Sequence, residues 1–196
     1  MSAMSSLQSP KVVIRDATPT DIPSIQDIAR STWADTYQGV IPEDAQAAVL
    51  NRAYSREVLE ISLDRHQAFL VAEVREDPRT GSGALGAFVD VDFNGQRVNL
   101  HCLYVLPAYQ RLGLGRRLLE AAVAQTRHIL PKSRSVPLVA HVERDNPKAR
   151  AFYRKMGFAE GEEEIVVIGG ISLPVIRISM TIEGDGRVPE NRTDSR

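Results

Sequence analysis

The chain has 196 residues, of which 43% are hydrophobic and 25% are charged, and its formal net charge is −1. This length fits one domain with a sizeable core, and the composition excludes a fibrous or wholly disordered protein. The near-neutral charge gives no reason to expect nucleic acid or an anionic membrane surface as the main partner.

Two polar tails flank the segment in which strand and helix patterns alternate. Residues 1–10 and 184–196 show no apolar periodicity, so we expect disordered tails on either side of a single domain at 11–183. In the first part of this domain the pattern predicts a strand at 11–15, a helix that starts at Thr20 and Asp21, a loop at 33–42, and two short helices at about 43–50 and 56–64.

The second part begins with strands at 68–74 and 84–93, joined by a loop rich in Pro, Gly and Ser at 76–83. Asn94-Gly95 is a hairpin signal, so a strand at 98–105 should pair antiparallel with the strand before it. The remaining elements are a helix at 114–129, a strand at 136–142, a helix at 147–156, and strands at about 163–168 and 173–182. This order predicts an α/β domain with a mixed sheet and helices on both faces.

The segment from Leu103 to Arg116 carries the strongest sign of a ligand site. A predicted buried strand enters a tight loop that leads directly into a helix, whose first N–H groups lack intrahelical partners and carry the positive end of the helix dipole. Gly113 and Gly115 would let a ligand approach this backbone closely. Together with Arg111 and Arg116, these features describe a cradle for a pyrophosphate, although a tight turn without a ligand could show the same glycines.

Two familiar phosphate-binding loops do not match this segment. A Walker loop requires Lys-Ser/Thr after its last glycine, where this chain has Arg116-Arg117. A dinucleotide fingerprint requires a third glycine at the position that Leu118 occupies. If the segment is a cradle, it belongs to a different class of phosphate site.

A second segment, Asn146 to Phe158, reads as a short capped helix with an aromatic pair in its second turn. The two segments together resemble the paired cofactor motifs of the GNAT superfamily of acyl-CoA-dependent N-acetyltransferases. The first motif, Gln/Arg-x-x-Gly-x-Gly/Ala, is matched by Gln110, Gly113 and Gly115. The second motif, Asn-x-x-Ala-x-x-x-Tyr followed by Gly-Phe, is matched by Asn146, Ala149, Tyr153, Gly157 and Phe158. The element order also fits this superfamily from about residue 11 to residue 182.

The resemblance implies a fold, a donor and a set of roles. The fold would be a GNAT-like, mostly antiparallel mixed sheet of about seven strands, and the acyl donor would be acetyl-CoA. Backbone groups of Leu103 and Val105 would hydrogen-bond the pantetheine arm, which Asn146 would also contact. Tyr153 would be the general acid that protonates the leaving thiolate, unless it only packs beside Phe152. The implied cofactor-binding residues are Leu103, Val105, Gln110, Arg111, Leu112, Gly113, Leu114, Gly115, Arg116, Asn146 and Tyr153.

The reaction also requires a general base, because an amine must lose a proton before it attacks a thioester. Many members of the superfamily place a Glu on the central strand, where this chain has Asn99. By strand alternation His101 shares a face with Asn99, Leu103 and Val105, and a neutral imidazole suits proton removal, so we name His101 as the candidate catalytic base. A structural histidine is an equal alternative, and the rival bases are Asp90, Asp92 and His141.

The acceptor side is predicted from residues 31–43, which are similar to the first helix and loop of a GNAT branch that includes polyamine acetyltransferases. In that branch the loop forms one wall of the acceptor groove. Trp33 and Tyr37, four residues apart, would share a helix face and contact the substrate together with Asn99, although both aromatic residues could be core. The acidic residues that could attract a cationic amine are Asp35, Glu43 and Asp44.

The only cysteine, Cys102, excludes an internal disulfide, and alternation predicts a buried side chain that points away from His101. This cysteine usage fits a reducing compartment, and residues 1–10 lack a signal peptide's apolar segment, so we expect a cytoplasmic protein. No run reaches the ~18 apolar residues of a membrane helix. No His, Asp and Glu set has metal-ligand spacing, so no metal is expected.

These observations favour an enzyme that transfers an acetyl group from acetyl-CoA to a primary amine of a small molecule, such as a polyamine or amino compound. A protein or peptide amine is the alternative acceptor. A non-catalytic acyl-CoA-binding module is the alternative from another class, since Asn99 stands at the usual position of the base. We expect neither nucleic acid nor a membrane as partner, and the sequence leaves a homodimer open.

Overall fold

The computed structural model describes residues 10–75 and 83–186. Nearly all of the predicted N-terminal tail, most of the predicted loop at 76–83 and residues 187–196 of the predicted C-terminal tail lie outside these ranges. Gly184 and Asp185, which we assigned to the C-terminal tail, donate backbone hydrogen bonds to Arg134 and Arg127 at 2.9 and 3.2 Å. Within the described ranges, no helix has the length and apolar character needed to cross a membrane.

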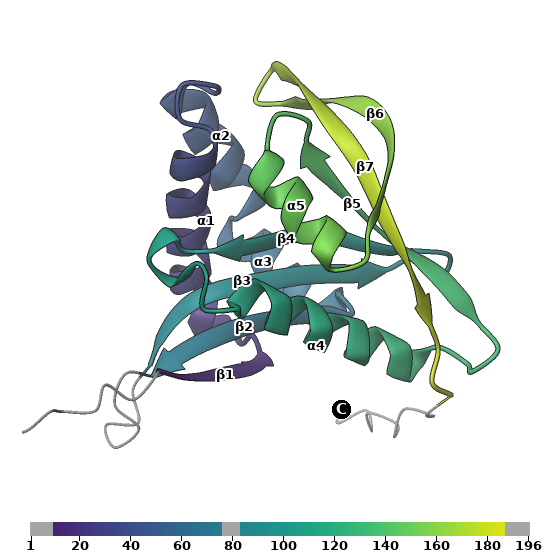
Figure 1. The fold of residues 1–196 in the computed structure, drawn as a ribbon. Coiled ribbons are helices and arrows are strands. Elements are labelled where there is room, and N and C mark those ends of the chain that lie inside the picture. The colour runs from purple at the N-terminus through teal and green to yellow at the C-terminus, as the bar shows by residue number, and fades with distance from the viewer. Residues whose placement is uncertain (1–9, 76–82, 187–196) are drawn as a thin grey trace, which may run out of the picture.

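Seven strands form one sheet in the order β1-β2-β3-β4-β5-β7-β6 (Figure 1). Every neighbouring pair is antiparallel except β4 and β5, which run parallel, so the predicted mixed and mostly antiparallel sheet is confirmed. The strands are β1 (Lys11–Asp16), β2 (Ala68–Arg75), β3 (Ala84–Phe93), β4 (Val98–Val105), β5 (Ser135–Glu143), β6 (Ala159–Ile168) and β7 (Ile171–Glu183).

The helices cover both faces of this sheet and divide the core in two. On one face pack α1 (Ile22–Thr36), α2 (Glu43–Ala53) and α3 (Arg56–Arg65), and on the other pack α4 (Leu114–Ile129) and α5 (Pro147–Lys155) (Figure 1). The α4 face buries Leu118 and Leu119 against Val89, whereas the α1 face buries Ile25 against Phe88. Because side chains alternate along β3, neighbouring residues of one strand serve both cores.

Helix α1 is longer than the sequence pattern predicted. We expected a loop from residue 33, but α1 continues to Thr36, and Trp33 is buried in the same core as Ile25 and Ala29. Trp33 extends the apolar stripe at the i, i+4 spacing of a helix, so its burial stabilises one more turn. The predicted loop therefore begins at Tyr37.

The edge strand β6 also starts earlier than predicted, at Ala159 instead of residue 163. Its first half carries Glu160, Glu162 and Glu163, which gave no strand signal because acidic residues are depleted in strands. Pairing with β7 imposes the extended form, and the register shift between Glu160 and Glu163 marks an irregularity in the ladder. Charged side chains on such an edge oppose pairing with another chain.

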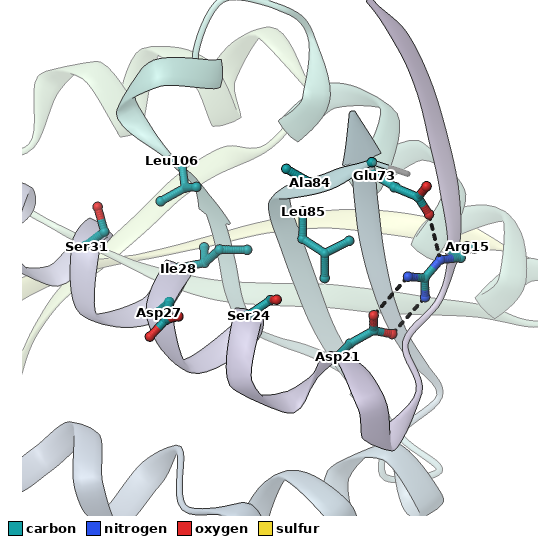
Figure 2. Close-up of a pocket in the computed structure, with 11 residues that line it drawn as sticks. Arg15, Asp21, Ser24, Asp27, Ile28, Ser31, Glu73, Ala84, Leu85 and Leu106 are labelled. Atoms are coloured by element: carbon teal, nitrogen blue, oxygen red, sulfur yellow. Dashed lines mark hydrogen bonds and ion pairs between the residues drawn. The ribbon is translucent and has the colours of Figure 1, made fainter. Parts of the chain in front are cut away.

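An ion-pair network joins β1, β2 and the start of α1. The Arg15 guanidinium donates to both carboxylate oxygens of Asp21 at 2.7 and 2.8 Å and to Glu73 at 3.3 Å (Figure 2). Asp21 also accepts the backbone N–H and the hydroxyl of Thr18. This network lines one end of a 550 Å³ pocket that extends to Leu106, and none of the sequence-predicted site residues line that pocket.

We expect Asp21→Asn to lower the free energy of unfolding at pH 7 by about 2 kcal/mol. The hydrogen bonds from Arg15 are the largest cause that lowers the pKa of Asp21 from its ordinary 3.8 to about 2. Because the folded-state pKa is depressed, this stabilisation is present above pH 3.8 and is lost as the pH falls towards 2. Urea unfolding of both proteins between pH 7 and pH 3 measures the difference, which should begin to shrink below about pH 4.

The matched control is Asp27→Asn, the same change at a side chain that is 79% exposed and pairs with Arg30. A surface pair of this kind contributes little, so the control should change the stability by less than about 0.5 kcal/mol. A difference between wild type and Asp21→Asn that stays constant over the whole pH range would contradict the electrostatic explanation.

Candidate active site

Strands β4 and β5 separate soon after they meet. Their register holds only two pairs, Val98 with Leu138 and Asn99 with Val139. Beyond these pairs β4 continues to Val105 beside β3, and β5 continues to Glu143 beside β7. Along this split, the β4 edge that faces β5 has no strand partner among the described residues, so backbone N–H and C=O groups on this edge are available to a ligand.

The predicted cradle lies at the open end of the split, where the loop after β4 enters α4. Arg111 and Gly113 both have positive φ, +67° and +76°, and α4 begins at Leu114. The backbone N–H of Arg117 bonds to Gly113, so the N–H groups that precede it remain as free donors of the first turn. Successive N–H groups in such a turn form a concave anion site.

The charges around the cradle favour an anion. The first turn of α4 contains no acidic residue and includes Arg116. Arg111 lies in the loop just before this turn. The Arg116 guanidinium binds Glu120 at 2.7 Å, so it extends along the helix surface in this structure. Gln110 donates to the Val105 carbonyl at 3.4 Å and also contacts Lys148, which brings a further cation to the loop.

The two glycines of the cradle serve different purposes. A Cβ at Gly113 would meet nothing within 4 Å, so space does not require a glycine here. The φ of +76° does, because residues with a side chain rarely adopt this conformation. A Cβ at Gly115 would lie 3.5 Å from Phe152 and Val105, an ordinary contact. The protein alone would therefore tolerate alanine at 115.

Tyr153 lies on α5, the helix that follows β5, and Asn146 caps that helix by accepting the Ala149 N–H at 3.0 Å. The Tyr153 ring packs edge-on against Phe152 and Phe158, with centroids 5.1 and 5.2 Å away. Burial raises the pKa of Tyr153 well above its usual range, and the nearby acidic groups Cys102, Tyr104 and Glu143 raise it further. A tyrosine phenol is already protonated at neutral pH, so Tyr153 carries a proton that it can donate, and the raised pKa means that this proton is held more tightly.

A β-bulge in β4 determines where His101 lies. Val91 pairs with Leu100 and Asp90 pairs with Cys102, so His101 is an extra residue on β4. Our alternation argument is therefore wrong for Leu103 and Val105, which pack into the α4 core, because the bulge resets the alternation after His101.

Asn99 and His101 do lie together, since both contact Asp92. The Asn99 amide donates to Asp92 Oδ1 at 2.8 Å, and His101 Nε2 lies 3.0 Å from the same oxygen. Cys102 is 8% exposed and belongs to the α1 core, as predicted for a buried cysteine, but the predicted orientation away from the Asn99 face is wrong because the bulge leaves Cys102 on that face. The predicted base, His101, is thus within hydrogen-bond distance of Asp92, one of the alternative candidate bases.

Sequence reasoning missed His66, which follows α3. Its ring stacks on that of His101, with centroids 5.2 Å apart and an interplanar angle of 25°. His66 Nδ1 lies 2.6 Å from Asp90, and this hydrogen bond raises the pKa of His66. The remaining candidate base, His141, has its Nε2 3.3 Å from Glu164 Oε2. No pattern in the sequence relates His66 to the sheet, so no local signal could have found it.

Trp33, in the last turn of α1, and Tyr37, just after this helix, contact the two sides of the split. Trp33 Nε1 donates to the Tyr104 hydroxyl on β4 at 2.8 Å, and the Tyr37 hydroxyl donates to Glu143 at the end of β5. The Trp33 and Tyr37 rings are 4.8 Å apart, and both residues are buried in the α1 core. They are thus core residues whose polar atoms reach the candidate site, and no sequence pattern pointed to Glu143.

The acidic residues predicted to attract an amine have no hydrogen bond or ion pair with the described residues of the split. Asp35, Glu43 and Asp44 are all exposed, and the Asp44 carboxylate accepts the N–H of Ala45. Among the residues that the structure describes, no group of three or more His, Cys, Asp and Glu could hold a metal ion.

Comparison with known proteins gives consistent matches. Residues 25–158 match the model of the acetyltransferase (GNAT) family. The chain is 26% identical over 147 residues to a spermidine N(1)-acetyltransferase of Thermoplasma acidophilum, covering 75% of this chain and 88% of that protein.

Solved structures share the fold. The crystal structure of PaiA N-acetyltransferase from Thermoplasma acidophilum in complex with coenzyme A superposes with a TM-score of 0.67 at 23% identity, covering 88% of this chain and 99% of that one. The ribosomal-protein-S18-alanine N-acetyltransferase from Escherichia coli superposes with a TM-score of 0.58 at 20% identity, covering 90% and 97%.

Acetyl-CoA should raise the melting temperature of the protein, because a ligand that binds the folded state stabilises it by mass action. We expect Gly113→Asp to abolish this increase, since the new carboxylate would lie where the cradle holds a pyrophosphate. Differential scanning fluorimetry with a titration of acetyl-CoA measures the effect.

The matched control is Gly95→Asp, which makes the same change at another glycine with positive φ and open space around its Cβ, in the β3–β4 hairpin. It should lower stability without altering the response to acetyl-CoA. A folded Gly113→Asp protein with the wild-type response would refute the cradle assignment.

Proposed function

The chain belongs to the acetyltransferase (GNAT) family and is an acyl-CoA-dependent N-acetyltransferase, and on this basis we propose that it transfers the acetyl group of acetyl-CoA to a primary amine of a small molecule. The observation that carries the proposal is the convergence of three features on the β4–β5 split. These are the unpaired edge of β4, the anion cradle at its open end, and the protonated phenol of Tyr153.

The residues present fit a CoA thioester. The N–H groups of the first turn of α4 would hold the pyrophosphate, as would those of the loop from Arg111 to Gly113. Backbone groups of Leu103 and Val105 on this edge of β4 would hydrogen-bond the pantetheine arm as a neighbouring strand would, with the arm replacing Gln110 at the Val105 carbonyl and Asn146 close to the arm. When bound, acetyl-CoA supplies a thioester carbonyl that a neutral amine can attack.

Proton transfer would be shared between the two sides of the split. When the amine forms its bond to the carbonyl carbon, the carbon–sulfur bond breaks and Tyr153 donates its proton to the sulfur. His101 would accept the proton that the amine gives up, directly or through water. If His101 donates its Nε2–H to Asp92, its Nδ1 is left as the free acceptor, so Asp92 is proposed to set the tautomer and to stabilise the imidazolium that forms.

The proposed acceptor is a small amine because a relative that matches 75% of the chain is a spermidine N(1)-acetyltransferase. Trp33 and Tyr37 would form its wall beside β4 and β5, and Asn99 would contact it next to the base. The likeness to the ribosomal-protein enzyme concerns the fold alone, so it does not favour a protein acceptor.

Thiol release from acetyl-CoA, measured with a panel of acceptors, tests this proposal. We expect turnover with small primary amines such as spermidine, 1,4-diaminobutane and butylamine. Peptides with free N-terminal amines or free lysines should give rates at least tenfold lower. Turnover with the peptides alone would contradict the small-molecule assignment.

For the base, we measure the pH dependence of turnover at saturating acetyl-CoA, in which one limb is the rise in turnover as the base loses its proton. We expect His101→Ala to remove this limb. The variant should then show only the titration of the acceptor amine, while binding of acetyl-CoA persists.

The comparison variant is His141→Ala, which removes the rival imidazole and should keep the limb. Loss of the limb in His141→Ala instead would assign the base to His141. A wild-type profile that rises only near the amine's own pKa would show that neither histidine acts as base.

A further inference from the structure

The carboxylate of Glu143 lies at the split without a cation to balance it. Glu143 is the last residue of β5 and is partly buried. Among the described residues, its carboxylate has one hydrogen-bond partner, the Tyr37 hydroxyl, and no Lys, Arg or His nitrogen lies within ion-pair distance. The adjacent Arg144 pairs instead with Asp145 and Glu163 at 3.1 Å.

One aromatic side chain contacts this carboxylate directly, and it begins a chain of aromatic contacts. Tyr37 donates to it and packs against Trp33, which in turn donates to Tyr104 across the split. Burial is the main cause that raises the pKa of Tyr104 and Tyr153, and the charge of Glu143 raises both further. Glu143 is therefore close enough to the proposed proton donor, Tyr153, for its charge to raise the pKa of that phenol.

A carboxylate beside an aromatic side chain matches the chemistry of an alkylammonium ion. The carboxylate forms charge-assisted hydrogen bonds with the ammonium, and the ring faces attract the same cation. A partly desolvated carboxylate with no cation is also unfavourable, so a ligand that brings a positive charge gains from it.

We propose that Glu143, held by Tyr37, binds a second and still protonated nitrogen of the acceptor, which makes the preferred acceptor a diamine or polyamine. This inference rests on the proposed acetyl transfer to a small amine. The nitrogen that attacks must be neutral, so Glu143 is assigned to the other nitrogen. His101 and Asp92 lie on the β3–β4 side of the split and Glu143 lies on the β5 side, so the two amines of one acceptor meet different groups.

The test compares 1,4-diaminobutane with butylamine, which has the same carbon chain and lacks the second nitrogen. Glu143→Gln removes the charge and keeps an oxygen for the Tyr37 hydroxyl. We expect KM for 1,4-diaminobutane to rise about 10- to 100-fold, the loss typical of a charge-assisted contact, with kcat within about threefold of wild type. KM for butylamine should not change, and kcat for butylamine should likewise stay within about threefold of wild type.

The matched control is Glu163→Gln, the same change on the exposed edge strand β6, which should leave both amines unaffected. The affinity for acetyl-CoA and the melting temperature of each variant report whether the fold is intact. Calorimetric titration of CoA-bound protein with 1,4-diaminobutane adds a readout that does not depend on turnover, and Glu143→Gln should weaken this binding by the same factor.

Three results would overturn the inference. An equal loss of kcat with both amines would make Glu143 a proton-transfer or structural residue, and unchanged constants would leave it without a role in acceptor binding. Wild-type protein that binds no 1,4-diaminobutane would exclude the subsite. The proposed function has a separate failure, turnover with peptides alone, and it survives if butylamine is acetylated while Glu143→Gln has no effect.

Discussion

Strands β4 and β5 run parallel but share only two residue pairs, and the site is organised around the backbone that this leaves unpaired. A parallel pair would ordinarily continue along both strands, and unpaired backbone groups within a sheet are costly unless something else satisfies them. Here β5 follows its antiparallel partner β7 through Glu143, whereas β4 stays with β3. The elements that follow the two strands, α4 and α5, bring the cradle and Tyr153 to the opening between them.

The bulge at His101 is the second departure from a regular sheet, and it separates two tasks along one strand. Before the bulge, Asn99 faces the Asp92 side, and after it Leu103 and Val105 return to the core under α4. A regular strand would continue one alternation over its whole length. With the extra residue, β4 can present a polar group at the narrow end of the split and keep its apolar contacts with α4 at the open end.

Most of the fold could be predicted from the sequence because its signals are local. The apolar stripe of α4, the Asn94-Gly95 hairpin and the two glycine-containing motifs each depend on residues close in the chain. The bulge could not be predicted, because it depends on the register between β3 and β4 rather than on either strand alone. The contacts of His66 with His101 and of Tyr37 with Glu143 join residues 35 and 106 positions apart, so only the tertiary fold reveals them.

The charges at the split are arranged for an acceptor whose two nitrogens differ in protonation. Reaction requires a neutral amine, yet most alkylamines are cations at neutral pH, so a site that simply attracted cations would hold the reacting nitrogen in its unreactive form. A carboxylate beside the reacting nitrogen would have this effect unless it also accepted the proton. In the proposed arrangement an imidazole is placed on the side of the reacting nitrogen, and the carboxylate of Glu143 is placed across the split. The attraction between Glu143 and the distal ammonium then contributes to binding without favouring protonation of the amine that attacks.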